Sequence, residues 1–240
     1  MNFQIEMLFC TFVITVILAL IIIPILTKLK VGQIERTDGP KSHLKKQGTP
    51  TMGGIIILLG ITIVTIFTSY HYYKNGDIVT ARRIIPLLLV AGGFGLIGFI
   101  DDFRKLVMHD TEGLKPAYKM LGLLVISVIY ILYLKNVLHV GTETYIPILK
   151  IYVRIPRSLY IIFAMFVMLG TTNAVNLTDG VDGLSGTLSV ITLFTIYLLE
   201  SVKGTNSAIN YITLILIVCV LAYLWFNATP SKLMMGDAGS

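Results

Sequence analysis

The segment from Asn173 to Gly183 carries the residues of this sequence best suited to chemistry. It holds two carboxylates, two carboxamides, one threonine hydroxyl and two glycines. The runs 158–175 and 184–199, which overlap or follow it, contain no charged residue. Polar side chains gathered between apolar segments are unfavourable at a membrane unless they bind something.

The spacing within this segment indicates what it would bind. Asp179 and Asp182 are three residues apart, so a helical turn would place both carboxylates on one face. Asn173 and Asn176 add donors and acceptors at the same spacing, and Gly180 would let the backbone approach a ligand closely. The segment predicts a polar, metal-assisted site for an anionic ligand. The competing interpretation is a helix-capping loop, in which Asx side chains satisfy free backbone groups.

Two further acidic motifs follow apolar runs: Asp101-Asp102, and Asp237 in a Met-Gly-Asp-Ala-Gly-Ser sequence. Local salt bridges with Arg104 and Lys105 are the alternative to a role in a site for Asp101-Asp102. Carboxylate oxygens with few histidines or cysteines favour Mg²⁺ or Mn²⁺ over zinc. Magnesium uses only one or two protein carboxylates beside water and phosphate. The remaining aspartates would therefore bind substrate hydroxyls or move a proton.

Lysines predicted on the same membrane side as these aspartates would hold phosphate groups as point charges. They are Lys45, Lys46, Lys105, Lys115 and Lys119. Aspartates, lysines and a divalent cation together resemble phosphoryl-transfer sites, where positioning and charge neutralisation supply most of the catalysis. The basic loop 41–46 could instead serve only to fix the membrane orientation.

The elements that must position these residues are transmembrane helices. The 240-residue chain is 55% hydrophobic and only 13% charged, about half the usual charge content, which indicates a polytopic all-α membrane protein. The net charge of +6 does not indicate a nucleic-acid partner, because the basic residues flank apolar runs, where they meet lipid or a phosphorylated substrate. We expect a single transmembrane domain over residues 1–240, with no cleavable signal peptide.

The apolar runs predict seven spans, joined by polar loops. A loop is expected at His71–Arg83, and alternation over residues 143–155 predicts a small strand pair at the membrane surface. The seven predicted spans are Met7–Leu26, Thr51–Tyr70, Ile84–Ile100, Ala117–Leu134, Ser158–Val175, Leu184–Leu199 and Ala208–Phe226.

Two patterns inside the spans have structural interpretations. Gly93, Gly95 and Gly98 match GxGxxG, but no strand precedes them, so close helix packing is expected rather than dinucleotide binding. Cys10 and Cys219 are expected to be buried apolar residues without a disulfide or a metal.

Seven spans alternate in direction, and this places the polar motifs on one membrane face. The loop after the first span, Asp101-Asp102, the 173–183 segment and Asp237 all fall on that side. The basic residues of the same side favour the cytoplasm, so the N-terminus would be extracytoplasmic. The count of spans thus predicts one composite cytoplasmic site.

Four motifs in this order resemble the phospho-N-acetylmuramoyl-pentapeptide transferase (MraY) family. They are Lys46-Gln-Gly-Thr-Pro-Thr-Met-Gly-Gly54, Asp101-Asp102-Phe-Arg-Lys105, the segment from Asn173 to Leu184, and Met235 to Ser240. The aspartate motifs are shared with the wider polyprenyl-phosphate N-acetylhexosamine-1-phosphate transferase superfamily. The resemblance covers essentially the whole chain.

The resemblance implies transfer of phospho-MurNAc-pentapeptide from its uridine nucleotide to undecaprenyl phosphate, giving lipid I and UMP, with Mg²⁺ required. It implies Asp237 as the Mg²⁺ ligand and Asp101 and Asp102 near the phosphates, one of them a proton acceptor. Asp179 would join these three as a catalytic residue. Substrate and phosphate contacts would come from Lys46, Thr51, Lys105, Lys119, Asn173, Asn176, Gly180, Asp182 and Asn227.

The same resemblance implies a multi-pass protein of the bacterial inner membrane, active on the cytoplasmic face, and a homodimer. The family continues beyond the Met-Gly-Asp-x-Gly-Ser element with further spans and a histidine-rich loop. We therefore expect weak or no turnover from residues 1–240 alone.

Three other functions compete with this prediction. A sister transferase would use another sugar nucleotide, such as UDP-GlcNAc, for teichoic acid or O-antigen, but Thr49-Pro-Thr-Met argues against it. A cation-coupled transporter would hold its carboxylates near the bilayer midplane and in repeated halves, and neither feature is evident. A structural scaffold would leave the clustered Asp and Asn unexplained.

Overall fold

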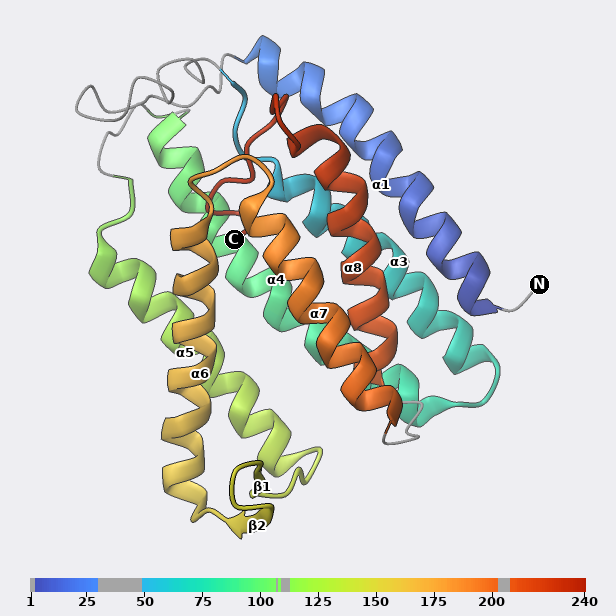
Figure 1. Cartoon of the computed structure of the whole chain (residues 1–240), viewed down its shortest axis with the longest axis vertical. Helices are drawn as coiled ribbons and strands as arrows, with labels where there is room; N and C mark the ends of the chain where they lie inside the picture. Colours follow the sequence, from blue (N-terminus) through green and yellow to red (C-terminus); the bar gives the residue numbers. More distant parts are fainter. Residues whose placement is uncertain (1–2, 30–48, 107, 109–112, 203–207) are drawn as a thin grey trace.

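The computed structural model describes residues 3–29, 49–106, 108, 113–202 and 208–240. In these ranges the chain forms seven helices, all long and apolar enough to cross a membrane, and one two-stranded sheet (Figure 1). The helices are α1 (Phe3–Lys28), α3 (Gly54–Lys74), α4 (Ile78–Leu106), α5 (Pro116–Asn136), α6 (Arg157–Thr178), α7 (Leu184–Val202) and α8 (Ala208–Asn227). The prediction of seven spans is confirmed.

Two of the predicted boundaries are wrong. The loop expected at His71–Arg83 shrinks to residues 75–77, because α3 continues to Lys74 and α4 begins at Ile78. At its other end α4 runs on to Leu106, so Asp101 and Asp102 lie within the helix rather than after it. Charged residues were taken as span ends, but a helix can continue past them where its polar face meets other polar groups.

The helices α1, α3 and α8 form the packed core of the bundle. Tyr223 of α8 and Ile56 and Ile61 of α3 are fully buried there. Small residues let the helices approach: a Cβ added at Gly60 would lie 2.9 Å from the Thr15 hydroxyl oxygen, and that hydroxyl also contacts the Cys219 sulfur at 3.4 Å. Such close contacts are how helices associate in lipid, where water does not drive burial.

The helices α5 and α6 form an arm that extends away from this core (Figure 1). No residue of α6 is buried, and large apolar side chains such as Phe166 are exposed along it. At the far end of the arm, β1 (Glu143–Ile146) and β2 (Ile151–Arg154) pair antiparallel, with Glu143 opposite Arg154. The strand pair predicted within 143–155 is confirmed.

The burial predicted for Cys219 and the close packing predicted for the glycines are confirmed, whereas the burial predicted for Cys10 is wrong. Cys10 and Cys219 are both free, and Cys219 is buried, but Cys10 is exposed on α1. The error has a simple cause, because apolar residues on an outer helix face lipid rather than protein. Close packing explains two of the glycines: a Cβ at Gly95 would lie 2.5 Å from a Leu58 methyl carbon, and one at Gly98 would overlap the Asp237 carbonyl oxygen.

Candidate active site

The final turns of α4 supply two adjacent aspartates with different partners. Asp101 accepts hydrogen bonds from the Leu114 amide (2.7 Å) and the Lys105 ammonium (2.8 Å). Asp102 accepts the backbone amides of Asp237 (3.2 Å) and Ala238 (2.9 Å), one on each carboxylate oxygen. Both aspartates are buried. The local salt bridge between Asp101 and Lys105, the alternative considered from the sequence, is therefore present. Lys105 also pairs with a carboxylate that is distant in the sequence.

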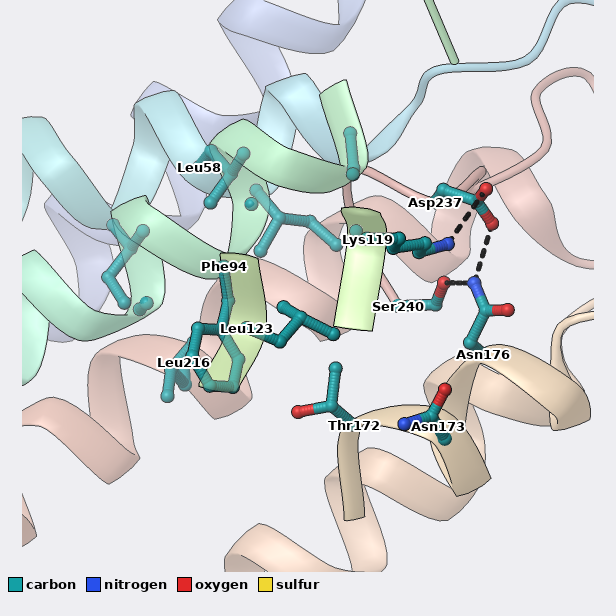
Figure 2. Close-up of a pocket in the computed structure, with 17 residues that line it drawn as sticks. Leu58, Phe94, Lys119, Leu123, Thr172, Asn173, Asn176, Leu216, Asp237 and Ser240 are labelled. Atoms are coloured by element: carbon teal, nitrogen blue, oxygen red, sulfur yellow. Dashed lines mark hydrogen bonds and ion pairs between the residues drawn. The ribbon is translucent and has the colours of Figure 1, made fainter. Parts of the chain in front are cut away.

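That distant carboxylate is Asp237, which binds groups from three helices. Its Oδ2 lies 2.9 Å from Lys105 Nζ of α4 and 3.1 Å from Lys119 Nζ of α5. Its Oδ1 accepts a hydrogen bond of 2.6 Å from Asn176 of α6, which also donates to the Ser240 hydroxyl at 2.8 Å. Figure 2 shows Lys119, Asn176 and Ser240 converging on Asp237.

The surroundings of Asp237 keep it ionised. Burial alone would raise the pKa of this carboxyl, but its contact with Asp101, the Asn176 hydrogen bond and the two lysines outweigh burial. The pKa of Asp237 therefore lies well below its ordinary range. The site therefore holds one ionised carboxylate beside two ammonium groups. A phosphorylated ligand could bind by taking the place of the carboxylate as the partner of these ammonium groups.

The segment from Met235 to Ser240 is held by backbone pairing as well as by side chains. Gly53 and Gly54 donate to the carbonyls of Met234 (2.9 Å) and Met235 (2.8 Å). Gly236 adopts φ +73°, which glycine tolerates, and its amide donates to Asp179 at 3.1 Å. A Cβ at Gly54 would overlap the Gly239 amide. Residues of three motifs distant in sequence, around Gly54, Asp102 and Asp179, thus bind this one short segment.

Asn227, at the end of α8, ties this segment to the α6–α7 connection. Its side-chain oxygen accepts the Gly183 amide (2.9 Å), and its side-chain nitrogen donates to the Leu233 carbonyl (2.7 Å). The residue is buried, so its amide serves backbone groups in this structure. We regard it as a residue that positions the segment around Asp237.

The structure gathers most of the sequence-predicted residues, but not all of them. Asp101, Asp102, Lys105, Lys119, Asn176, Asp179 and Asp237 form one connected cluster, called here the carboxylate–lysine cluster. Thr51 borders it, because a Cβ at Gly236 would lie 3.0 Å from the Thr51 hydroxyl oxygen. Lys46 lies outside the described residues, as do Lys41 and Lys45.

Asn173, Gly180 and Asp182 lie in the same region, on α6 and in the turn that follows it. Asn173 donates to the Leu169 carbonyl at 2.7 Å within α6. Gly180 is exposed, with open space where a side chain would stand. The prediction that Asp179 and Asp182 share a helical face is wrong, because α6 ends at Thr178 and both aspartates lie in the turn before α7. Two glycines within that turn favour an irregular connection over a continued helix.

Sequence reasoning did not connect the glycines with the site, although it expected close packing at Gly98. Gly98 lies one turn before Asp101 and makes room for the Asp237 backbone, and Gly54 does the same for Gly239. Ser240 was seen only as part of a motif, although it shares the Asn176 amide with Asp237. The available signal was the density of small residues in these motifs.

A cavity of about 210 Å³ leads from the cluster into the bundle. Lys119, Asn176, Asp237 and Ser240 line its polar end, and Leu58, Phe94, Leu123 and Leu216 line its apolar end (Figure 2). A ligand with a charged head and a hydrocarbon tail would match this gradient of polarity.

The donor set around Asp237 suits a cation that a substrate helps to hold. Among the described residues no three carboxylates, histidines or cysteines converge as a complete metal site. Magnesium, however, is often bound by one or two carboxylates with phosphate and water completing its shell. Asp237 and Asp101 share the same two lysines. If the phosphate of a substrate binds these lysines instead, the two carboxylates are available to hold magnesium in this way.

Two family models match this chain. Residues 84–240 match the model described as glycosyl transferase family 4. Residues 46–58 match the signature described as phospho-N-acetylmuramoyl-pentapeptide-transferase signature 1. Between them the matched regions contain every member of the carboxylate–lysine cluster and the segment that pairs with Met234 and Met235.

Curated relatives resemble the chain along most of its length. A phospho-N-acetylmuramoyl-pentapeptide-transferase of Halalkalibacterium halodurans is 40% identical over 97% of this chain and 69% of the relative. Proteins of the same name from Acetivibrio thermocellus and Staphylococcus carnosus are each 42% identical, covering 96% and 95% of this chain and 67% and 70% of those relatives. With its seven apolar helices, the chain is a multi-pass membrane protein.

Proposed function

Because the chain belongs to the phospho-N-acetylmuramoyl-pentapeptide-transferase family, we propose that it transfers phospho-MurNAc-pentapeptide from UDP-MurNAc-pentapeptide to undecaprenyl phosphate. The products are lipid I and UMP, and the reaction is the first membrane step of peptidoglycan synthesis. The observation that carries the proposal is the carboxylate–lysine cluster, in which Lys105 and Lys119 meet Asp237 at the mouth of an apolar cavity.

In the proposed reaction an oxygen of undecaprenyl phosphate attacks the phosphorus that bears the sugar. A new P–O bond forms there, the P–O bond to UMP breaks, and UMP leaves with the electron pair. Such transfers depend mainly on alignment and on neutralising charge over the phosphoryl oxygens. Lys105 and Lys119 supply positive charge at that point, and the polar end of the cavity would take the acceptor phosphate.

Magnesium is part of the proposal, with Asp237 as its protein ligand. When bound, the ion would neutralise the diphosphate and polarise the bond to the leaving UMP. Asp101 holds both lysines on the side where that diphosphate would lie. Asp179 fixes the Gly236 amide, and thereby the backbone that carries Asp237.

Asp102 has a different part in this scheme. Both of its oxygens accept backbone amides of the Asp237 segment, so the carboxylate is held against that segment. We propose that Asp102 positions Asp237 and that the proton acceptor, where one is needed, is Asp101. Asn173 of α6 and Gly180 and Asp182 of the α6–α7 turn would contact the nucleoside, and Lys46 and Thr51 would add further substrate contacts.

The membrane orientation belongs to the same proposal. The cluster lies at the end of the bundle that holds the last turns of α4 and the α6–α7 turn, and the hairpin lies at the other end (Figure 1). We propose that the cluster faces the cytoplasm of a bacterial inner membrane, with the N-terminus outside, and that the protein is a homodimer.

The test is Mg²⁺-dependent release of UMP from UDP-MurNAc-pentapeptide in the presence of undecaprenyl phosphate. It would use the longest natural form of the protein that contains this sequence. Asp179→Asn and Asp237→Asn should each lose most of the activity. Release of UMP from UDP-GlcNAc instead would contradict the substrate, and no nucleotide consumption at all would contradict the transferase.

A further inference from the structure

A recess of about 510 Å³ lies at the base of the β1–β2 hairpin, at the end of the α5–α6 arm and away from the cluster (Figure 1). The residues that line it come from the end of α5, the hairpin and the start of α6. Three of them are cationic, one is a histidine, and none is acidic: Lys135, His139, Val140, Gly141, Thr142, Arg154, Ile155, Pro156 and Arg157. Nothing in the proposed transfer reaction uses this recess.

One of the cations forms the frame of the recess. Lys135 is buried, and its ammonium donates to the carbonyls of Val140 (2.9 Å) and Gly141 (2.8 Å). It also lies 3.8 Å from the centre of the Tyr160 ring. These contacts fix the chain between α5 and β1, so the recess has a defined shape.

The other two cations remain available to a ligand. Arg157 is exposed and bonds only the neutral Asn136 side chain among the described residues. Arg154 is exposed and makes no ion pair or hydrogen bond through its side chain within the described ranges. Glu143 faces Arg154 across the strands, yet no ion pair joins them. Unneutralised arginines present planar donor groups that match phosphate oxygens.

The start of α6 adds to the attraction for an anion. Pro156 caps this helix without a side-chain hydrogen bond, so the first backbone amides of α6 remain free to donate. Those amides carry the positive end of the helix dipole, and Arg157 is the first residue of that helix.

The hairpin tip identifies the source of the anion. Ile148 and Leu149, in the turn between the strands, are 92% and 62% exposed, and Tyr152 of β2 is 74% exposed. Apolar side chains this exposed, next to helices that cross the bilayer, belong at the lipid interface. Leu159 and Ile162 continue the exposed apolar surface along α6. A ligand in the recess would therefore have its charged group beside Arg154 and hydrocarbon beside α6.

We propose that this recess binds the phosphate group of an anionic phospholipid in the leaflet opposite the carboxylate–lysine cluster. The lipid would lie with its phosphate between Arg154 and Arg157 and its acyl chains along α6. This inference does not depend on the reaction catalysed at the other membrane face.

The experiment measures phosphatidylglycerol retained by the protein in nanodiscs of phosphatidylglycerol and phosphatidylcholine, by native mass spectrometry across a series of lipid ratios. The variant Arg154→Gln/Arg157→Gln should weaken retention by on the order of tenfold or more, since each basic residue near a lipid headgroup contributes about a factor of five. The matched control is Lys74→Gln/Arg83→Gln, which removes two exposed charges at the same end of the bundle but outside the recess. The control should retain phosphatidylglycerol like the parent.

Glu143→Gln gives a test that does not depend on loss of binding. Removing the one carboxylate opposite Arg154 should strengthen phosphatidylglycerol retention, which a damaged hairpin would not do. Equal retention by the arginine variant, the control and the parent would overturn the proposal.

A phosphate group in the recess could come from a phospholipid or from free inorganic phosphate, and adding inorganic phosphate distinguishes the two. In nanodiscs of phosphatidylcholine alone, millimolar phosphate should leave the recess empty. In the mixed nanodiscs, Ile148→Ser/Leu149→Ser should reduce retention of phosphatidylglycerol. Tight binding of inorganic phosphate that depends on Arg154 and Arg157, with no preference for the lipid, would overturn the lipid assignment.

Discussion

Asp102 is a buried carboxylate whose hydrogen bonds hold the backbone of the Asp237 segment. Its two oxygens accept the amides of Asp237 and Ala238, and only 5% of the residue is exposed. In Asp102→Asn, an amide NH₂ would face a backbone N–H, leaving one buried donor without an acceptor. We expect the free energy of unfolding to fall by about 1–3 kcal/mol, together with most of the activity.

Thermal unfolding in detergent, followed by circular dichroism, checks this prediction for Asp102. Asp102→Asn should lower the midpoint and raise the Mg²⁺ concentration needed for half-maximal activity, since Asp237 moves with the segment. An unchanged midpoint with lost activity would instead mean that Asp102 acts directly on substrate.

Lys119 should contribute mainly through its charge. Its ammonium lies 3.1 Å from Asp237 and 3.4 Å from Asp101. Charged hydrogen bonds to phosphate are worth about 1.5–3 kcal/mol, so Lys119→Gln should lower kcat/KM by about 10- to 100-fold. Lys115→Gln, one turn earlier and exposed, should stay within about twofold, and steady-state UMP release compares the two. Equal losses in both variants would contradict a specific role for Lys119.

Among the elements, α4 determines the site through its shape as well as its aspartates. A Cβ at Gly98 would overlap the Asp237 carbonyl, whereas one at Gly92 on the same helix meets nothing within 4 Å. Displacing a reacting group by about 1 Å can lower a rate about 100-fold. We therefore expect Gly98→Ala to lose activity by roughly that factor.

Gly92→Ala is the matched control for Gly98→Ala. It should retain activity and stabilise α4 by up to about 1 kcal/mol, because alanine favours helix more than glycine does. Both are measured by UMP release and thermal unfolding. Full activity in Gly98→Ala would mean that the Asp237 segment is not held against α4.

The start of α4 is capped by a titratable group. Asp77 Oδ1 accepts the Thr80 amide at 3.0 Å, and this backbone hydrogen bond lowers the pKa of Asp77 below its ordinary value of 3.8. A lowered folded-state pKa stabilises the fold above the unfolded-state pKa, and the contribution is lost as pH falls through the folded-state value.

The resulting prediction concerns the low-pH end of stability. Between pH 5 and about pH 3, the parent should lose thermal stability more steeply than Asp77→Asn, which keeps a cap but cannot be protonated. The unfolding midpoint in detergent, measured at each pH, gives both slopes. Parallel slopes would contradict a contribution from Asp77.

At the scale of the molecule, the bundle has two chemically different ends. The cluster lies with the α6–α7 turn, which holds Gly180, and the hairpin turn, which holds Lys150, lies at the opposite end (Figure 1). If the cluster faces the cytoplasm, a cysteine at position 150 should react with an impermeant maleimide in intact spheroplasts. Gly180→Cys should react only in inverted vesicles, because Gly180 is exposed at the other face.

The labelling needs a background in which Cys10 and Cys219 are replaced by alanine. Cys219 is buried and Cys10 lies within the membrane-spanning helix α1, so we expect neither replacement to change a surface that faces water. Labelling of Gly180→Cys in spheroplasts would reverse the orientation that the basic residues indicate, and would move the phospholipid recess to the inner leaflet.

The sequence alone determined the seven spans, the strand pair and the convergence of the polar motifs. Long uncharged runs have few alternatives in lipid, because every backbone group must be satisfied within the segment. Alternation of direction then places Asp101, the 173–183 segment and Asp237 on one face, whatever the tilts of the helices. The four quoted motifs were sufficient to identify the family that the relatives confirm.

Only the tertiary structure decided which partner each side chain takes. Sequence spacing suggested Asp179 and Asp182 on one helical face, but the chain turns after Thr178 and Asp179 binds the Gly236 amide instead. Asp101 and Asp102 are adjacent in sequence, yet Asp101 binds two lysines and the Leu114 amide, whereas Asp102 binds two backbone amides of the Asp237 segment. Such roles depend on contacts between residues far apart in the sequence, 57 positions for Asp179 with Gly236 and 136 positions for Asp102 with Ala238. The local sequence does not specify such contacts.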